Sequence, residues 1–377
     1  MDPATLNPAN GTAETAASGA PNGVAGSTLA TGGGAFKTLE QFIIEREAEA
    51  PGSKGQFSRL LRDIAVAAKI VDRDVRKAGL VDLFGDTGDV NVQGEVQKKL
   101  DLLAHEEFVR ALRRGGEVCL IGSEEHAEAI PLLFEECQGK YVVLFDPLDG
   151  SSNVDVNVSI GTIFSIYRIP DDHVGRVSLQ SALQCGRQQV AAGYVVYGSS
   201  TILVYTTGAG VNGFTLDPSI GEFLLSHPNI TTPARGQMYS INEGNYNSWE
   251  PGLKEYIKWM QTEAPDDTPA RPYTTRYIGS FVADFHRNLV KGGIYIYPTN
   301  PRNPSGKLRL MYEANPMAFI VEQAGGRAET GHGPILDVEP GALHDRCPVY
   351  IGSPDMVADA VAFLAGERTS TDEAPAS

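Results

Sequence analysis

The sequence predicts an α/β protein with mixed sheets, built as two domains. Helical periodicity dominates the first ordered part of the chain, and short β-prone runs follow it. At 377 residues the chain is longer than a single typical core organises, which favours two domains that share a large interface. We place the first domain at residues 36–225 and the second at residues 226–366.

Both ends of the chain are polar. Residues 1–35 contain no Lys or Arg and carry only Asp2 and Glu14 as charged groups, which predicts a disordered tail. A signal peptide needs a basic start and an apolar centre, and a transit peptide needs arginine, so neither is expected. Residues 367–377 form a second polar tail, and no apolar run approaches the length of a membrane span.

Two helices are predicted before the first long strand. Apolar residues at helical spacing between Leu60 and Val71 predict a helix that continues toward Gly79, where glycine offers a C-terminal cap. A second helix is expected from Val96 to Arg114, with Val96, Leu100 and Leu103 on one face.

Strands prevail from Val118 onward. β-prone runs predict them at residues 118–121, 141–145, 160–167, 190–197 and 201–205. Residues 208–213 match the G-x-G-x-x-G pattern of dinucleotide sites, but residues 214–218 continue as another strand. Because a dinucleotide site needs a helix there, we expect a hairpin turn. Residues 233–271, rich in loop formers, lead into a more mixed second half.

Charge and cysteine content narrow the function classes. The formal net charge of −16 argues against nucleic acid or an anionic membrane as a partner. A polyanionic substrate would therefore need a local group of Lys and Arg, together with metal. The four cysteines are scattered and form no C-x-x-C, so we expect reduced thiols in a cytoplasmic protein.

The most informative segment begins at the end of the apolar run Tyr141–Phe145, which suits a central strand buried on both faces. Asp146 follows this run directly. Pro147 cannot donate to a strand ladder, so pairing should stop there and free the Leu148 carbonyl. With Asp146 and Asp149, that carbonyl offers the hard oxygen ligands that Mg²⁺ prefers. An ordinary strand-to-turn junction with two surface aspartates is the alternative.

The next residues suit a phosphate. Gly150 permits a tight turn, and Ser151 or Ser152 can cap a following helical turn whose amides face an anion. The complete ordered set of acids, proline, glycine and serines therefore predicts a combined magnesium and phosphate site.

Further carboxylates occur at predicted strand ends and helix starts, where open α/β sheets bind ligands. Several acids around one point repel unless cations lie between them, so two or more Mg²⁺ ions are expected. These carboxylates belong to Glu95, Asp101, Glu124, Glu125 and Glu313, the last at the end of the alternating run 308–312.

The second half supplies basic and tyrosine side chains. Arg, Lys and Tyr donors are typical around a phosphate that is held but not cleaved. They occur in the turn-rich segment 239–245, in residues 276–287, at Tyr295 and Tyr297, and at Lys307.

Taken in order, these segments resemble the class 1 fructose-1,6-bisphosphatase family, which bacteria and eukaryotes share. The resemblance covers about residues 36–365 and implies a layered α-β-α-β-α sandwich of the sugar phosphatase type. The DPLDGSS core alone also resembles inositol monophosphatases and related lithium-sensitive phosphatases, and the sugar-phosphate half separates the two. The matching segments are 98–101, 123–125, 140–153, 161–164, 242–244, 276–287 and 307–326.

The resemblance implies a role for each matching residue. Metal ligands would be Glu124, Asp146, the Leu148 carbonyl, Asp149 and Glu313. Asp101 and Glu125 would orient and deprotonate the attacking water, with Glu95 in a supporting role. Gly150, Ser151 and Ser152 would hold the reacting 1-phosphate, and Asn242, Tyr277, Tyr297 and Lys307 the 6-phosphate and sugar, with Arg276 reaching in from a neighbouring subunit.

The resemblance further implies hydrolysis of fructose 1,6-bisphosphate to fructose 6-phosphate, as in gluconeogenesis, with Mg²⁺ or alternatively Mn²⁺. It implies a homotetramer and inhibition by AMP at Ser58, Lys140, Tyr141 and Arg168. A sedoheptulose-1,7-bisphosphatase or dual enzyme is an alternative, because one extra carbon changes a pocket only slightly. A non-catalytic AMP-responsive binding protein is the other alternative.

Overall fold

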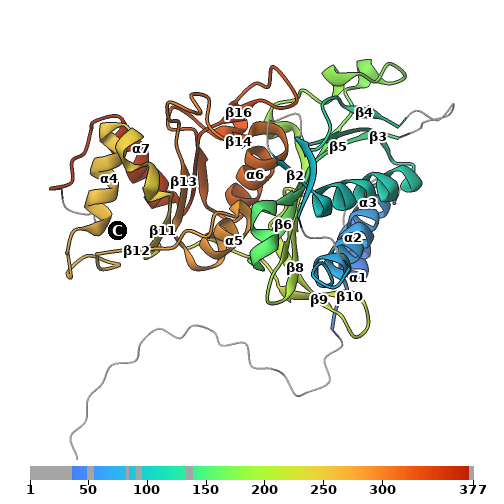
Figure 1. The fold of residues 1–377 in the computed structure, drawn as a ribbon, viewed down its shortest axis with the longest axis horizontal. Coiled ribbons are helices and arrows are strands. Elements are labelled where there is room, and N and C mark those ends of the chain that lie inside the picture. Colours follow the sequence, from blue (N-terminus) through green and yellow to red (C-terminus); the bar gives the residue numbers. More distant parts are fainter. Residues whose placement is uncertain (1–35, 49–54, 82–84, 91–95, 133–138, 373–377) are drawn as a thin grey trace, which may run out of the picture. The chain divides into compact units, whose positions relative to one another are not determined.

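Two mixed sheets organise the computed structural model, which describes residues 36–48, 55–81, 85–90, 96–132 and 139–372 (Figure 1). The described residues from Lys37 onward belong to one compact unit. The larger sheet has eight strands in the order β10-β9-β8-β7-β6-β5-β3-β4, antiparallel except for the parallel pair β3 and β5. Its strands are Glu222–His227 (β10), Val211–Asp217 (β9), Thr201–Thr206 (β8), Gln189–Tyr197 (β7), Ile160–Arg168 (β6), Tyr141–Asp149 (β5), Val118–Ser123 (β3) and Ile130–Pro131 (β4).

The second sheet has five strands in the order β12-β11-β13-β17-β15. These are Thr274–Thr275 (β12), Met238–Ser240 (β11), Ile294–Tyr297 (β13), Val349–Gly352 (β17) and Arg327–Glu329 (β15). Two small pairs complete the described strands: Asp86–Val90 (β1) with Val96–Lys98 (β2), and Leu308–Arg309 (β14) with Arg346–Cys347 (β16).

Helices and sheets alternate in layers, which confirms the predicted mixed α/β sandwich (Figure 1). The helices α4 and α7 cover one face of the five-stranded sheet, α5 and α6 lie between the two sheets, and α1, α2 and α3 pack on the other face of the eight-stranded sheet. Three clusters of buried apolar side chains fill the spaces between these layers. The α-helices are Leu39–Ala48 (α1), Gln56–Val75 (α2), Lys99–Gly115 (α3), Pro251–Gln261 (α4), Phe281–Lys291 (α5), Asn315–Gln323 (α6) and Pro354–Leu364 (α7).

Shorter helical turns connect these elements. A π-helical turn, η6, spans Leu310–Ala314, and the 3₁₀ helices are Ser151–Val156 (η1), Asp171–His173 (η2), Leu179–Ser181 (η3), Gly186–Gln188 (η4), Glu243–Ser248 (η5) and Ile335–Asp337 (η7).

Both predicted early helices exist, but their boundaries differ from expectation. The helix α2 ends at Val75, where the backbone N–H of Arg76 caps it, so the prediction of a cap at Gly79 was wrong. The second helix begins at Lys99 rather than Val96, because residues 96–98 pair with β1 as a strand. Tertiary pairing here overrides the helical pattern.

The predicted strands of the first half are confirmed, each within a few residues, by β3, β5, β6, β7 and β8. The segment that resembles a dinucleotide motif joins β8 to β9 as a hairpin, as predicted, with Thr206 opposite Val211. The helix α4 lies within the stretch read as loop-rich. Its buried Leu253, Tyr256, Ile257 and Met260 have helical spacing that a shorter window would have revealed.

None of the helices in the described part of the chain combines the length and apolar character that a membrane crossing requires. Among the described residues, Cys119, Cys185 and Cys347 form no disulfide bonds, while Cys137 lies outside them.

Gly161 sets the distance between α5 and the large sheet. It lies opposite Asp149 in the ladder of β5 and β6. A Cβ atom there would lie 2.1 Å from the Val195 carbonyl oxygen and 2.7 Å from a Val282 methyl carbon of α5. Only a residue without a side chain therefore allows this packing.

We predict that Gly161→Ala lowers the free energy of unfolding by about 1–3 kcal/mol, because the new methyl group overpacks the sheet–helix contact. Urea unfolding measures this change. Gly333→Ala is the control, since a Cβ there meets no atom within 4 Å. Equal losses in the two variants would contradict the packing argument.

Candidate active site

The segment Asp146–Asp149 forms a β-bulge in β5. Its register against β6 shifts between these two aspartates, and pairing resumes at Asp149. The predicted break in pairing occurs at Pro147, but the strand does not end there, because the ladder resumes two residues later. The bulge satisfies its own backbone: the Leu148 N–H donates to Asp146 Oδ1 at 2.9 Å, and the Pro147 carbonyl accepts from Thr162 at 2.8 Å. A bulge of this kind re-aims side chains at the end of a strand.

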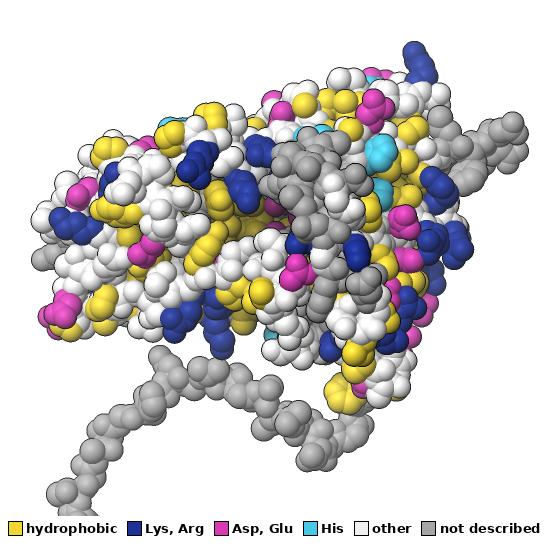
Figure 2. Space-filling model, in the orientation of Figure 1, with side chains coloured by type: hydrophobic (Ala, Val, Ile, Leu, Met, Phe, Trp, Pro, Cys, Tyr) yellow, Lys and Arg dark blue, Asp and Glu magenta, His cyan; other side chains and the backbone are white. Residues whose placement is uncertain are grey.

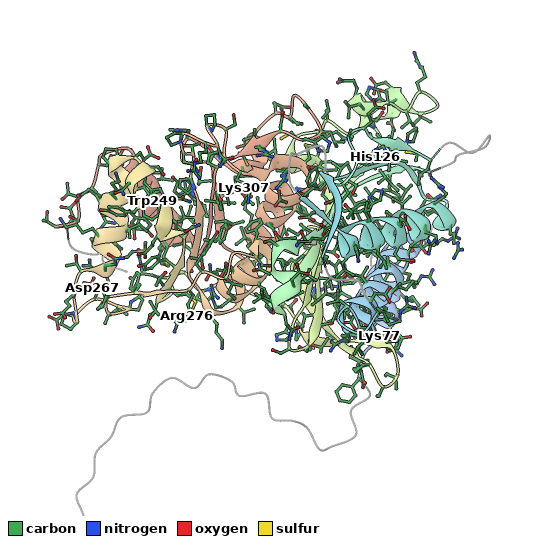
Figure 3. The ribbon with its side chains drawn as sticks, in the orientation of Figure 1. Lys77, His126, Trp249, Asp267, Arg276 and Lys307 are labelled. Carbon is green, nitrogen blue, oxygen red and sulfur yellow. The ribbon has the colours of Figure 1, made fainter. Side chains whose placement is uncertain are left out.

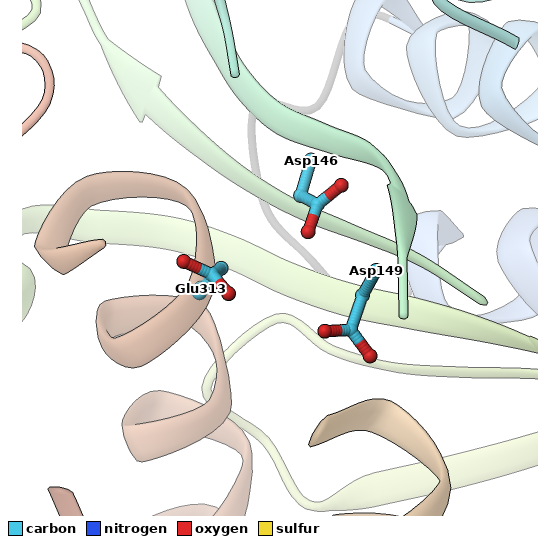
Figure 4. A group of neighbouring side chains, drawn as sticks. All are labelled: Asp146, Asp149 and Glu313. Carbon is cyan, nitrogen blue, oxygen red and sulfur yellow. The ribbon is translucent and has the colours of Figure 1, made fainter. Parts of the chain in front are cut away.

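Three buried carboxylates converge beside this bulge (Figure 4). Asp146, Asp149 and Glu313 each offer one oxygen, and these oxygens lie within 4.8 Å of one another. Burial, followed by the neighbouring Glu124, raises the pKa of Asp146 well above its ordinary value. Burial, followed by Glu313, raises the pKa of Asp149 to about 7. Buried carboxylate oxygens this close together fit hard divalent cations, which offset their repulsion.

Asp149 is held by the start of α5. Its Oδ2 accepts hydrogen bonds from the Val282 N–H at 2.7 Å and from the Ser280 hydroxyl at 3.2 Å. These donors lower the pKa of Asp149 and oppose the larger effect of burial. The sequence interpretation missed Ser280, although a serine directly before a helix start is a recognisable signal.

Arg309 is a second residue that the sequence interpretation missed. Its side chain is buried, and its guanidinium lies 2.6 Å from Glu124 Oε1 and 3.8 Å from Glu313 Oε2. A charged residue within the apolar run 308–312 was the available signal. The arginine partly neutralises the acidic cluster. It also links the turn after β3, which carries Glu124, to η6, which carries Glu313.

The run 308–312, read as alternating up to Glu313, is a strand only over β14. It then turns into the π-helical turn η6, which leads into α6. Glu313 Oε2 accepts from the Arg309 N–H at 2.6 Å, and this bond fixes the carboxylate at the cavity. Single π-turns are frequent at functional sites because they place one residue out of the regular helical register.

Asp101 lies in the first turn of α3, where its Oδ2 accepts from the Lys98 N–H at 3.1 Å. Burial and then the charge of Glu125 raise the pKa of Asp101 to about 7. Glu125 follows Glu124 in the turn after β3. Glu95, predicted to support them, lies outside the described residues.

The predicted serine cap is replaced by glycine. The turn η1 begins at Ser151, so Gly150 occupies the capping position, with a φ of 78°. A Cβ on Gly150 would lie 2.7 Å from the Ser280 Cβ. Glycine is needed here both for its backbone conformation and for the close approach of α5.

Most of the predicted catalytic, metal and substrate residues line one cavity of about 590 Å³. Lys307, labelled in Figure 3, belongs to it, and Figure 2 shows a hollow in the same region with Lys and Arg side chains along its rim. From the predicted set, the cavity is lined by Asp101, Glu124, Glu125, Asp146, Leu148, Asp149, Gly150, Ser151, Ser152, Tyr277, Tyr297, Lys307 and Glu313.

Two other predicted residues line an adjoining pocket. Asn242 and Arg276 face it, and Tyr277 lines both the pocket and the main cavity. The loop before α5 that carries Arg276 and Tyr277 is held by Asp284, whose carboxylate accepts from the Ile278 and Gly279 N–H groups at 3.0–3.2 Å.

A separate pocket of about 380 Å³ lies between α1, α2 and the large sheet. It brings together Ser58, Tyr141 and Arg168 from the predicted AMP set, whereas Lys140 is absent from its lining. The ring of Phe57 packs edge-on against Tyr141. The Ser58 hydroxyl donates to the Glu47 carboxylate at 2.5 Å.

The raised pKa of Asp101 makes stability depend on pH. The carboxyl titrates near its ordinary value of 3.8 in the unfolded chain and at about 7 in the folded protein. The folded protein therefore holds an extra proton between about pH 4 and pH 7. The resulting stabilisation is fully present below about pH 4 and is lost as the pH rises through 7.

We predict that Asp101→Asn, with divalent metal chelated, is more stable than the unsubstituted protein by about 2 kcal/mol at pH 8, because no buried charge forms. Denaturant unfolding at pH 8 and pH 5 measures this, and the difference should narrow at pH 5. Asp155→Asn is the control, because a hydrogen bond from Lys98 lowers the pKa of Asp155. A pH-independent effect of Asp101→Asn would contradict the prediction.

Comparison with known proteins bears on this geometry. The family model described as the N-terminal domain of fructose-1-6-bisphosphatase matches residues 37–228, and that of the C-terminal domain matches residues 232–365. A class 1 fructose-1,6-bisphosphatase of Salinibacter ruber is 67% identical over 337 residues, covering 89% of this chain and 93% of the relative. One from Chloroherpeton thalassium is 57% identical over 333 residues, covering 88% and 94%.

Solved structures agree with the sequence relatives. The holo form of Leishmania major fructose-1,6-bisphosphatase superposes with a TM-score of 0.82 at 43% identity and covers 89% of this chain and 100% of its own. The T-state of that enzyme gives a TM-score of 0.77 at 42% identity, covering 88% and 99%. Both domain models, the relatives and the structural neighbours agree, and the chain therefore belongs to the fructose-1,6-bisphosphatase family of phosphatase enzymes.

Proposed function

We propose that the protein is a magnesium-dependent phosphatase that hydrolyses the 1-phosphate of fructose 1,6-bisphosphate and releases fructose 6-phosphate, a step of gluconeogenesis in the cytoplasm. The observation that carries the proposal is that two different groups of side chains line one cavity. Buried carboxylates and the Gly150 turn form one part, and tyrosines with Lys307 form another. A substrate with two phosphates at opposite ends matches this division.

The carboxylates would hold the metal. Asp146, Asp149 and Glu313 converge at short range, and Glu124 joins them through Arg309. When bound, divalent cations neutralise phosphate charge and acidify water, which the slow hydrolysis of a phosphate monoester requires. Mg²⁺ suits carboxylate and carbonyl oxygens, and Mn²⁺ suits the same donors.

Asp101 and Glu125 would serve the attacking water. The pKa of Asp101 is about 7, raised by burial and by the Glu125 charge, so this carboxyl can accept or release a proton near neutral pH. Water would attack phosphorus in line with the departing sugar oxygen. Gly150, Ser151 and Ser152 would bind the phosphate oxygens. The spacing of acids in Asp146–Asp149 differs from the D-x-D motif of aspartyl-phosphate enzymes, which favours direct attack by water.

The second phosphate would be held without being cleaved. Tyr277, Tyr297 and Lys307 line the cavity, and Asn242 and Arg276 line the adjoining pocket. Arg276 is exposed, and its guanidinium donates to the Thr275 carbonyl at 3.0 Å. We propose that it completes the site of a neighbouring subunit in a homotetramer.

One other substrate and one non-catalytic role define the alternatives. Sedoheptulose 1,7-bisphosphate has one more carbon, which a pocket of this size discriminates only slightly. A non-catalytic AMP-responsive protein would not require a converging set of buried acids, whose desolvation costs stability.

We predict that, with Mg²⁺, fructose 1,6-bisphosphate is hydrolysed far faster than inositol 1-phosphate, because only the bisphosphate engages the remote donors. Phosphate release from both compounds and from sedoheptulose 1,7-bisphosphate measures this. Lys307→Ala should raise KM for fructose 1,6-bisphosphate by about 10-fold or more, through loss of a charged contact.

Asp146→Asn is the matched loss-of-activity variant. It should remain folded, with hydrolysis reduced by orders of magnitude, because a ligand that acts mainly in the transition state is removed. Equal rates on inositol 1-phosphate, or normal turnover by Asp146→Asn at saturating Mg²⁺, would reject the proposed function.

We also propose that AMP inhibits by binding the pocket between α1, α2 and the large sheet. Arg168 offers a cation for the phosphate, Tyr141 an aromatic surface, and Ser58 a hydroxyl group. The Leishmania enzyme has a structure described as a T-state, which agrees with allosteric control in a relative.

We predict that AMP inhibits hydrolysis and that Arg168→Ala weakens this inhibition at least about 10-fold, because a charge-assisted contact is lost. Activity titrated with AMP measures both effects. Arg176→Ala removes an exposed arginine elsewhere and should leave the inhibition unchanged. Insensitivity of the unsubstituted enzyme to millimolar AMP would refute this second proposal.

A further inference from the structure

A single turn carries two of the proposed active-site acids. This acidic turn, residues 124–129, follows β3 and contains Glu124 and Glu125; His126, labelled in Figure 3, belongs to it. The turn joins β3 to β4, the Glu124 N–H donates to the Phe145 carbonyl at 3.2 Å, and Arg309 pairs with the Glu124 carboxylate. Because Glu124 also faces the repulsion of Asp146, further contacts that hold the turn bear on its geometry.

The first such contact joins the beginning of the turn to α3. The Glu125 N–H donates to the Ser123 hydroxyl oxygen at 3.4 Å, and that oxygen lies 2.8 Å from Nδ1 of His105. Burial lowers the pKa of His105 to about 4, so the ring is neutral at pH 7. The neutral ring therefore forms one hydrogen bond with the Ser123 hydroxyl through Nδ1. His105 lies four residues after Asp101, on the same face of α3.

The second contact joins the end of the turn to η6. His344 Nε2 lies 3.1 Å from the Ala127 carbonyl oxygen, and its Nδ1 lies 2.8 Å from the Tyr312 hydroxyl. A carbonyl can only accept, so Nε2 carries the hydrogen and Nδ1 accepts from the phenol. Burial lowers the pKa of His344, consistent with this neutral form. Tyr312 directly precedes Glu313.

Each imidazole therefore connects the acidic turn to another carboxylate-bearing element. His105 connects it to the helix of Asp101, and His344 connects it to the π-turn of Glu313. His105 and His126 also stack in parallel, with ring centroids 6.3 Å apart and planes inclined by 2°.

We propose that His105 and His344 are positioning residues that hold the acidic turn so that Glu124 is in the geometry needed to bind divalent metal and Glu125 in the geometry needed to serve the attacking water. The inference rests on the proposed metal-dependent function. A pre-formed ligand set spares the cation the cost of ordering the turn, so loss of either histidine should weaken metal binding more than it weakens substrate binding.

The test compares His105→Leu and His344→Leu with the unsubstituted enzyme in assays titrated with Mg²⁺. We expect the Mg²⁺ concentration for half-maximal activity to rise about 10-fold or more in each variant. At saturating Mg²⁺, KM for fructose 1,6-bisphosphate should be nearly unchanged. Without substrate, the Mg²⁺ concentration that raises the melting temperature should shift in parallel.

Conservative variants distinguish a role of each histidine in hydrogen bonding to the acidic turn from a role in packing alone. His105→Asn keeps a side chain that can accept from or donate to the Ser123 hydroxyl, and His344→Gln keeps a donor for the Ala127 carbonyl, so both should restore much of the metal affinity. Tyr312→Phe removes only the hydroxyl that bonds to His344. It replaces His344→Leu in the Mg²⁺ titration if that variant does not fold.

Tyr194→Phe is the matched control. It removes a tyrosine–histidine bond of the same 2.8 Å length, to His286, that does not touch the acidic turn. It should lower stability and leave the Mg²⁺ requirement unchanged. If the histidine variants also lose only stability, the proposal is overturned and the histidines are structural. If the unsubstituted enzyme ignores Mg²⁺ altogether, the proposed function fails first and this inference with it.

Discussion

Mutual repulsion among buried carboxylates is the constraint on which the rest of this structure depends. Asp146, Asp149 and Glu313 offer oxygens within 4.8 Å of one another, and Glu124 adds a further charge. Such a cluster is costly to bury, so its surroundings must supply compensating groups. The N–H of Val282, the Ser280 hydroxyl and the Arg309 guanidinium do this directly.

The layered architecture explains how these groups reach one point. The bulge at the end of β5 comes from the large sheet, whereas α5 and η6 come from segments more than a hundred residues later. They meet because α5 and α6 lie between the two sheets (Figure 1). Glycines at positions 150 and 161 allow α5 to approach this closely, since a Cβ at either position would collide with it. The geometry of the site therefore depends on the core packing between α5 and the large sheet.

The cavity contains basic and tyrosine side chains as well as acids, and both groups bear on which ligand it can bind. A chain with a net charge of −16 repels a bisphosphate at long range. Lys307, Tyr277 and Tyr297 provide local donors in the same cavity as the acids. The cavity therefore combines donors for anions with carboxylates that can hold cations.

The sequence alone determined the fold class, most strands of the first half and the residues of the central motif. Those signals are local: a buried strand reads as a continuous apolar run, and the ordered acids, proline, glycine and serines after it occur within nine residues. The resemblance to a family added the separate segments around this motif.

Tertiary structure decided what depends on distant neighbours. The bulge that resumes pairing at Asp149 requires β6, and the strand at 96–98 requires β1. The π-turn at Glu313 contacts β5 and β6. The buried ion pair of Arg309 with Glu124 and the histidine contacts of the acidic turn also join residues from separate segments of the chain. A local pattern shows the propensity and periodicity of a segment. It does not show which distant residue will pair with a given hydrogen-bonding or charged group, because those partners meet only when the layers pack.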